Sequence, residues 1–161
     1  MDSIISYFNG EKFQCLIGAV GSVLCIALSV YSLFLQKPIL KGLAFTVIPI
    51  AILLLAVCIG VIARTPKDIK RVTTYYQETP EKIKTEELPR MEKVINSFSI
   101  LKKVEIALFL IGLVGVVLFW RNEMIRGISL GLIIMACALY TFDHIAQTRG
   151  KGYVQYLNSL S

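Results

Sequence analysis

The chain has 161 residues, of which 55% are hydrophobic and only 17% are charged, and its formal net charge is +6. Soluble domains contain about 45–50% apolar and about 25% charged residues, so this composition excludes an ordinary soluble domain. The mean hydropathy of +0.67 is concentrated in stretches that carry no charged side chain, namely 16–35, 42–63, 106–120 and 127–142. The sequence therefore predicts an integral membrane protein.

The first uncharged stretch, 16–35, is long enough to cross a bilayer without help from its flanks. A membrane-spanning helix needs about 20 apolar residues, with a range of about 17–25. Asp2 and Glu11 precede this stretch, whereas a secretory signal begins with basic residues and has a shorter apolar region. We therefore expect a retained transmembrane helix over about 13–35.

A second span is predicted over about 42–63, and a new helix is predicted directly after it. In "ARTPKDIKRV", Thr65 is a suitable N-cap and Pro66 suits the first helical position. An amphipathic helix lying on the membrane surface is an alternative for 66–78, because lysines and tyrosines together suit that interface. From Arg90, apolar residues at three-four spacing lead without a breaker into the third span, which predicts one helix over about 90–120.

The third and fourth spans are predicted over about 104–120 and 125–144, and the distribution of basic residues gives the orientation. With four spans, thirteen of the 17 Lys and Arg residues lie on the side of the two termini and of the 64–103 segment. Short loops rich in Lys and Arg stay in the cytoplasm. We therefore expect both termini and the 64–103 segment to lie in the cytoplasm.

The predicted fold is all-α: a single membrane domain, 1–161, with four transmembrane helices in a compact bundle and a helical cytoplasmic segment, 64–103. Small residues recur at helical spacing in three of the spans, where they let helix backbones approach closely. The predicted packing residues are Gly18, Ser22, Gly112, Gly115, Gly127 and Gly131. The same stripes would suit the interface of a homo-oligomer, and both possibilities stay open.

Ionisable residues gather at the predicted cytoplasmic boundary, where the ends of three spans meet at one depth. The predicted cluster consists of Arg64, Lys103, Glu105, Asp143 and His144. One interpretation is a set of ion pairs that fixes the helix ends, with Arg64 or the lysines at 102 and 103 pairing with Asp143 and His144. The other is a proton or ion relay, which the almost wholly apolar interior of the spans disfavours.

The pattern of reactive residues does not favour catalysis. The cysteines, Cys15, Cys25, Cys58 and Cys137, form no Cys-x-x-Cys pair and are interpreted as free thiols that pack like small apolar side chains. His144 is the only histidine, and no Glu-x-x-His repeat or nucleophile motif accompanies it. We expect no metal, no cofactor and no enzymatic activity, and no nucleic-acid partner.

Several fragments together resemble a group of small bacterial inner-membrane proteins of similar length. The fragments are Arg64-Thr65-Pro66, Pro89-Arg90-Met91-Glu92, Glu105 in "KKVEIAL", Asp143, and Arg149-Gly150 with Tyr153. The resemblance covers about 60–156, and it departs from the group at Lys67-Asp68, where a Gln is expected. Some members of the group are encoded beside toxins of contact-dependent secretion systems, so the resemblance implies an immunity role.

We therefore expect an immunity protein that binds and neutralises a membrane-targeting, pore-forming toxin, with the lipid bilayer as its other partner. The residues expected to bind the toxin lie in the 64–103 segment: Lys67, Lys70, Arg71, Tyr75, Tyr76, Arg90 and Glu92. The alternative is a small proton- or ion-coupled transporter or channel that uses Glu105, Asp143 and His144.

Overall fold

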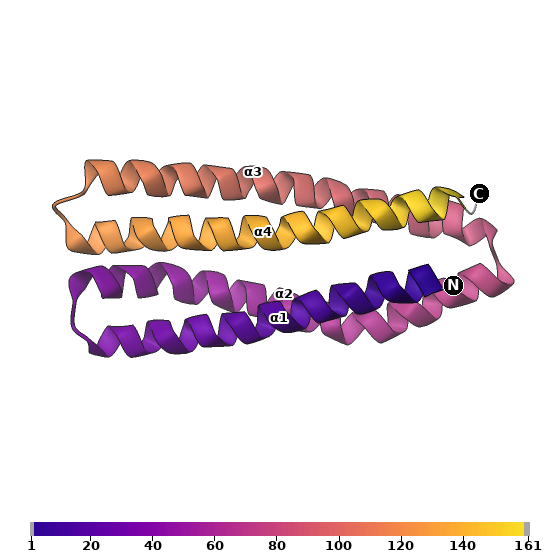
Figure 1. The fold of residues 1–161 in the computed structure, drawn as a ribbon, viewed down its shortest axis with the longest axis horizontal. Coiled ribbons are helices and arrows are strands. Elements are labelled where there is room, and N and C mark those ends of the chain that lie inside the picture. Colours follow the sequence, from indigo (N-terminus) through magenta and orange to yellow (C-terminus); the bar gives the residue numbers. More distant parts are fainter. Residues whose placement is uncertain (1, 160–161) are drawn as a thin grey trace.

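The computed structural model describes residues 2–159, and almost all of them are helical (Figure 1). The long helices are α1, Asp2–Phe34; α2, Pro38–Glu78; α3, Leu88–Leu118; and α4, Glu123–Ser159. A short π-helical segment, η1, Ile83–Glu87, lies between α2 and α3. No strand occurs within 2–159. The predicted all-α class is confirmed, and the helix expected over about 90–120 is present as α3.

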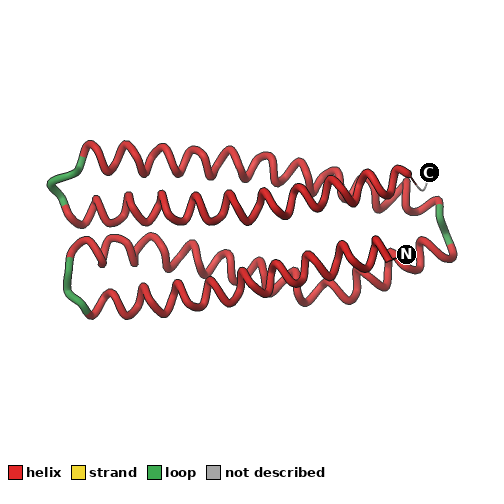
Figure 2. Tube along the Cα trace, viewed as in Figure 1, coloured by secondary structure: helices red, strands yellow, loops and turns green. Residues whose placement is uncertain are grey.

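The helices run up and down the long axis of the molecule. Figure 2 shows the turns at 35–37 and 119–122 at one end, and both termini at the other end together with the turn after α2. We call the latter the terminal end of the bundle. The helix α1 packs on α2, α3 packs on α4, and the two hairpins meet mainly through α2 and α4. The helix α4 therefore contacts every other helix of the bundle.

Three of the helices, α1, α2 and α4, are long and apolar enough to cross a membrane. The helix α3 falls short of this because its uncharged part, 106–118, follows Lys102, Lys103 and Glu105 and is shorter than a span of about 17 residues. These helices indicate a membrane protein. The fourth crossing by α3 and the cytoplasmic position of the termini stay predictions.

The helix start predicted at Thr65 and Pro66 is wrong, because α2 continues through both residues to Glu78. The hydroxyl of Thr65 donates to the carbonyl of Val61 at 2.7 Å, one turn earlier, as it does inside a helix and not at an N-cap. The segment after Pro66 also packs in the core, with Val72 fully buried. Segment 66–78 is therefore the continuation of α2 and part of the bundle.

Glycines lie where the backbones of neighbouring helices come closest. A Cβ atom on Gly127 would overlap the carbonyl oxygen of Ile39, and one on Gly42 would overlap that of Met124. The remaining predicted packing glycines also lie at close contacts between helices: Gly18, Gly112, Gly115 and Gly131. Ser22 is buried, and its hydroxyl donates to the carbonyl of Gly18. These small residues therefore pack the helices of one chain together.

The bundle is less closed than the compact arrangement that the sequence predicts. Within residues 2–159, no Cα atom of α3 lies within 8 Å of a Cα atom of α1 or α2. The helix α3 is instead held along α4 and, at the terminal end, by η1. This one-sided packing leaves a space between α2 and α3.

Candidate functional site

The space between α2 and α3 is an apolar groove with a cavity volume of about 470 Å³. Volumes of about 300–1,000 Å³ are typical of ligand sites. Its walls are formed by α2 and α3, and α4 contributes the floor together with part of α1. The apolar lining consists of Ile50, Leu53, Leu54, Val57 and Val61, of Val94, Phe98, Leu101, Val104 and Leu108, and of Leu139, Phe142 and Ala146.

Two carboxyl groups, those of Glu105 on α3 and Asp143 on α4, lie together in the wall of this groove. Their side chains are close enough to share a hydrogen bond. Glu105 is only 5% exposed, and among the described residues no donor reaches its buried Oε2 atom. Because two ionised carboxylates have only acceptors, the pair can bond internally only when it holds a proton. An incoming donor would satisfy it equally well.

Two other residues of the predicted cluster, Lys103 and His144, do not join the carboxyl pair. The Nζ atom of Lys102 lies 3.0 Å from Nδ1 of His144 and donates to Oε1 of Gln147 at 2.6 Å. Lys103 is exposed and has no ion pair or hydrogen bond within residues 2–159. The structure thus brings Glu105 and Asp143 together, whereas His144 belongs to a separate contact with Lys102.

Arg64 is also directed away from Asp143, toward carboxylates that the sequence analysis did not single out. Its Nη2 atom lies 3.1 Å from Oε1 of Glu11, and its Nε atom lies 3.7 Å from Oδ2 of Asp68. Asp68 in turn pairs with Arg71, whose Nη2 atom is 3.0 Å from Oδ1. The expected pairing of Arg64 with the helix-end cluster is therefore replaced by a second network.

This charge network centres on Glu87, which is 1% exposed at the terminal end of the bundle. Arg90 donates to its carboxylate from Nη2 at 2.6 Å and from Nε at 2.9 Å. The Nη2 atom of Arg71 lies 3.5 Å from Oε2 of Glu87, and the hydroxyl of Tyr153 donates to Oε1 at 3.5 Å. Glu87 thereby ties α2, α3 and α4 together.

Arg90 remains charged in this environment. Burial alone would lower the pKa of its guanidinium, but the hydrogen bond and the negative charge of Glu87 outweigh burial and raise that pKa above its ordinary value. A buried carboxylate needs such a permanently charged partner. The Arg90 guanidinium therefore keeps its positive charge beside Glu87.

Aromatic side chains surround the charge network. The rings of Tyr7 and Tyr153 stack with centroids 4.2 Å apart, and Phe8 meets both edge-on. The hydroxyl of Tyr7 donates to Sδ of Met91 at 3.8 Å. Since these residues come from α1, α3 and α4, the network is part of the core at the terminal end and has a structural role.

The residues predicted to bind a partner through the 64–103 segment separate into two groups. Arg71 and Arg90 are committed to Glu87, Tyr75 donates to Glu86 at 2.6 Å, and Tyr76 packs against the core. The exposed group consists of Lys67, Lys70 and Glu92. The segment is mostly helix and presents few of the predicted side chains to a partner.

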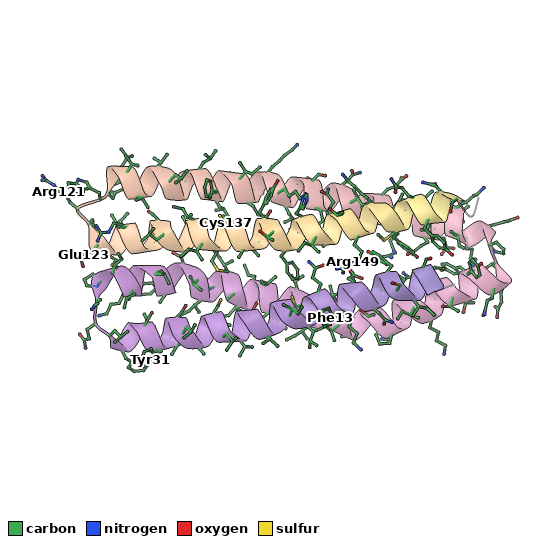
Figure 3. The ribbon with its side chains drawn as sticks, in the orientation of Figure 1. Phe13, Tyr31, Arg121, Glu123, Cys137 and Arg149 are labelled. Atoms are coloured by element: carbon green, nitrogen blue, oxygen red, sulfur yellow. The ribbon has the colours of Figure 1, made fainter. Side chains whose placement is uncertain are left out.

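The described residues contain no group of three or more His, Cys, Asp or Glu side chains that could hold a metal ion. All four cysteines are free thiols. Cys15 and Cys58 are buried, whereas Cys137, labelled on α4 in Figure 3, is exposed, which differs from the buried position expected for it.

Comparison with protein-family models, with curated proteins and with solved structures gives no match. The resemblance to the inner-membrane group therefore stays a prediction. The groove and its carboxyl pair are the structural features that bear on function.

Proposed function

We propose that this chain is a non-enzymatic protein of the bacterial inner membrane, with both termini in the cytoplasm, that binds and neutralises a membrane-inserting toxin. The observation that supports binding is the apolar groove between α2 and α3, which the chain's own helices leave open. An immunity protein needs such a surface and needs no catalytic group. The resemblance described above is the reason for proposing a toxin as the partner.

The dimensions of the groove suit a helix. Its α3 wall runs from Val94 to Leu108, which at 1.5 Å per residue is about 21 Å. An apolar helix laid into a groove between two helices buries one ridge of side chains, as in other helix-in-groove complexes. Inside a bilayer, this packing and polar contacts drive helix association. A toxin helix docked here would contact α2, α3 and α4 together.

The proposal is tested by a growth assay in which the chain is co-expressed with each toxin-like gene from its own genomic neighbourhood. We expect protection against one toxin and no other, and we expect Leu53→Trp to abolish protection by filling the groove. Leu28→Trp on α1 is the matched control, because Leu53 and Leu28 are 67% and 68% exposed but only Leu53 lines the groove. Absence of protection against every neighbouring toxin would contradict the proposal.

A second candidate function is proton- or ion-coupled transport, and the pairing of Glu105 with Asp143 in the groove favours it. Under this hypothesis, the wild-type protein in liposomes moves protons or ions, and Glu105→Gln and Asp143→Asn fold normally but lose the flux. Both variants remove a charge at nearly constant volume, so packing is kept. Unchanged flux in both variants would exclude the carboxyl pair as the coupling site.

A further inference from the structure

We propose that Glu105 and Asp143 form the recognition point for one positively charged side chain, a lysine or arginine, on the helix that docks between α2 and α3. This inference rests on the proposed function and specifies the chemistry of the partner. The partner is an apolar membrane helix that carries one basic residue where its apolar stretch approaches the terminal end of the bundle.

Within residues 2–159, one buried oxygen atom of the carboxyl pair lacks a hydrogen-bond donor. Glu105 is 5% exposed, it lines the groove, and its Oε2 atom has no hydrogen-bond donor among the described residues. Buried carboxylates in proteins are normally paired with a cation or bonded to donors. Inside a membrane, ionisable residues are rare and mark functional sites. Asp143 is half-buried and lines the groove as well, so it is the part of the pair that a donor can reach from there.

Two cations near the pair, Lys102 and Arg64, are engaged elsewhere, and Lys103, two residues before Glu105, lies on another face of α3 and is exposed. Lys102 is held by His144 and Gln147, at 3.0 and 2.6 Å. Arg64, which also lines the groove, is held by Glu11 and Asp68. A lysine ammonium brings three N–H donors and an arginine brings five, so either one can bond to both carboxyl groups at once.

The shape of the surroundings favours a helix over a free ion. The carboxyl pair lies in a groove whose walls are apolar on both sides of it, from Ile50 to Val61 on α2 and from Val94 to Leu108 on α3. A hydrated metal ion would leave these walls uncovered. A helix with apolar side chains and one basic residue covers the walls and neutralises the carboxyl pair together.

The depth of the basic residue follows from the sequence around Glu105. This residue immediately precedes the uncharged part of α3, 106–118, and Asp143 immediately follows the uncharged stretch 127–142 of α4. The pair thus lies where the apolar part of the bundle ends. The partner's lysine or arginine is therefore expected at the corresponding end of its own apolar stretch.

The test uses the full chain in liposomes and synthetic transmembrane peptides of leucine and alanine that carry Lys, Leu or Glu at this depth. Binding is followed by energy transfer between a dye on the protein's N-terminus and a dye on the peptide. We expect the Lys peptide to bind at least about tenfold more tightly than the Leu peptide, as is typical of close charge pairs. The Glu peptide is expected to bind most weakly.

The preference for the Lys peptide is expected to vanish when Glu105→Gln and Asp143→Asn are combined. Glu123→Gln is the control, because Glu123 is exposed and does not line the groove, and it is expected to keep the preference. The comparison of peptides on the wild-type protein needs no variant, so the test holds even if the double variant does not fold.

Several results would overturn the inference. Equal binding of the Lys and Leu peptides would exclude charge recognition while leaving the groove as a helix site. Binding of no peptide, with toxin protection intact, would place the toxin contact elsewhere. If tetraphenylphosphonium binds at the carboxyl pair and no peptide does, the site is one for small hydrophobic cations. Failure of the growth assay alone would overturn the toxin proposal, whereas peptide preference would still support the recognition point.

Discussion

Replacing Glu87 with alanine is expected to lower the free energy of unfolding by about 3 kcal/mol. The substitution leaves Arg71 and Arg90 without their shared buried carboxylate, and removing one partner of a buried ion pair costs roughly 3–5 kcal/mol. The lower end applies because the two arginine side chains are 39% and 28% exposed and can recover some hydration. For a chain of this size, the melting temperature should fall by about 6–12 °C.

Thermal unfolding of the purified protein in detergent, followed by circular dichroism, measures this effect. Glu92→Ala is the matched control, since Glu92 is an exposed glutamate in the first turns of α3, five residues after Glu87. The control should change the melting temperature by no more than about 1–2 °C, in keeping with surface substitutions. Equal melting temperatures for the two variants would show that the network around Glu87 does not stabilise the fold.

Replacing Gly127 with alanine is expected to separate the two hairpins or to destabilise their contact. The new Cβ atom would fall on the carbonyl oxygen of Ile39, a backbone atom that cannot turn away as a side chain can. Overpacking of a close contact costs about 1–3 kcal/mol, and a backbone obstacle favours the upper part of that range. The helices α2 and α4 would have to move apart.

The control for Gly127→Ala is Gly60→Ala, because a Cβ atom on Gly60 meets nothing within 4 Å. Alanine is the better helix former by about 0.5–1 kcal/mol, so Gly60→Ala should leave the melting temperature unchanged or raise it. The same glycine-to-alanine change is thus expected to lower the melting temperature at Gly127 but not at Gly60. If Gly127→Ala also stabilised the protein, the close approach of α2 to α4 would be wrong.

The sequence allowed the long helices to be predicted because uncharged stretches of this length have few other stable structures in a membrane. It also allowed the packing glycines to be predicted, because small residues recur there at helical spacing. Thr65 and Pro66 were misleading, because local capping rules ignore the tertiary contacts that carry α2 through Pro66. Val72, which is fully buried after that proline, provides such a contact.

The charge network was not predictable from composition, because Glu87 lies in a run of charged residues that resembles a solvated surface. Its neighbour Glu86 is exposed, and only the fold distinguishes the two. The partners Arg71 and Tyr153 are remote in sequence. The spacing of Glu87 to Arg90, and of Asp68 to Arg71, is three residues in each case, and this helical pairing was the one available signal.

The groove was not predictable either, since it depends on a contact that does not form. The apolar faces of α2 and α3 suit a closed bundle as well as an open one, so hydrophobic patterning cannot distinguish them. The candidate residues Glu105 and Asp143 were identified from their position at the ends of apolar stretches. Their pairing, and the separate contact of His144 with Lys102, depends on the rotation of α3 and α4 about their axes.

The helix α3 is attached to the rest of the chain at its two ends and along one side only. The turn at 119–122 fixes one of its ends and η1 fixes the other, while α4 supports one of its sides and neither α1 nor α2 supports the opposite side. A rigid-body movement of α3 on α4 would therefore change the width of the groove without disturbing the α1–α2 hairpin or its contact with α4. The same groove residues would then contact docked helices of different diameter.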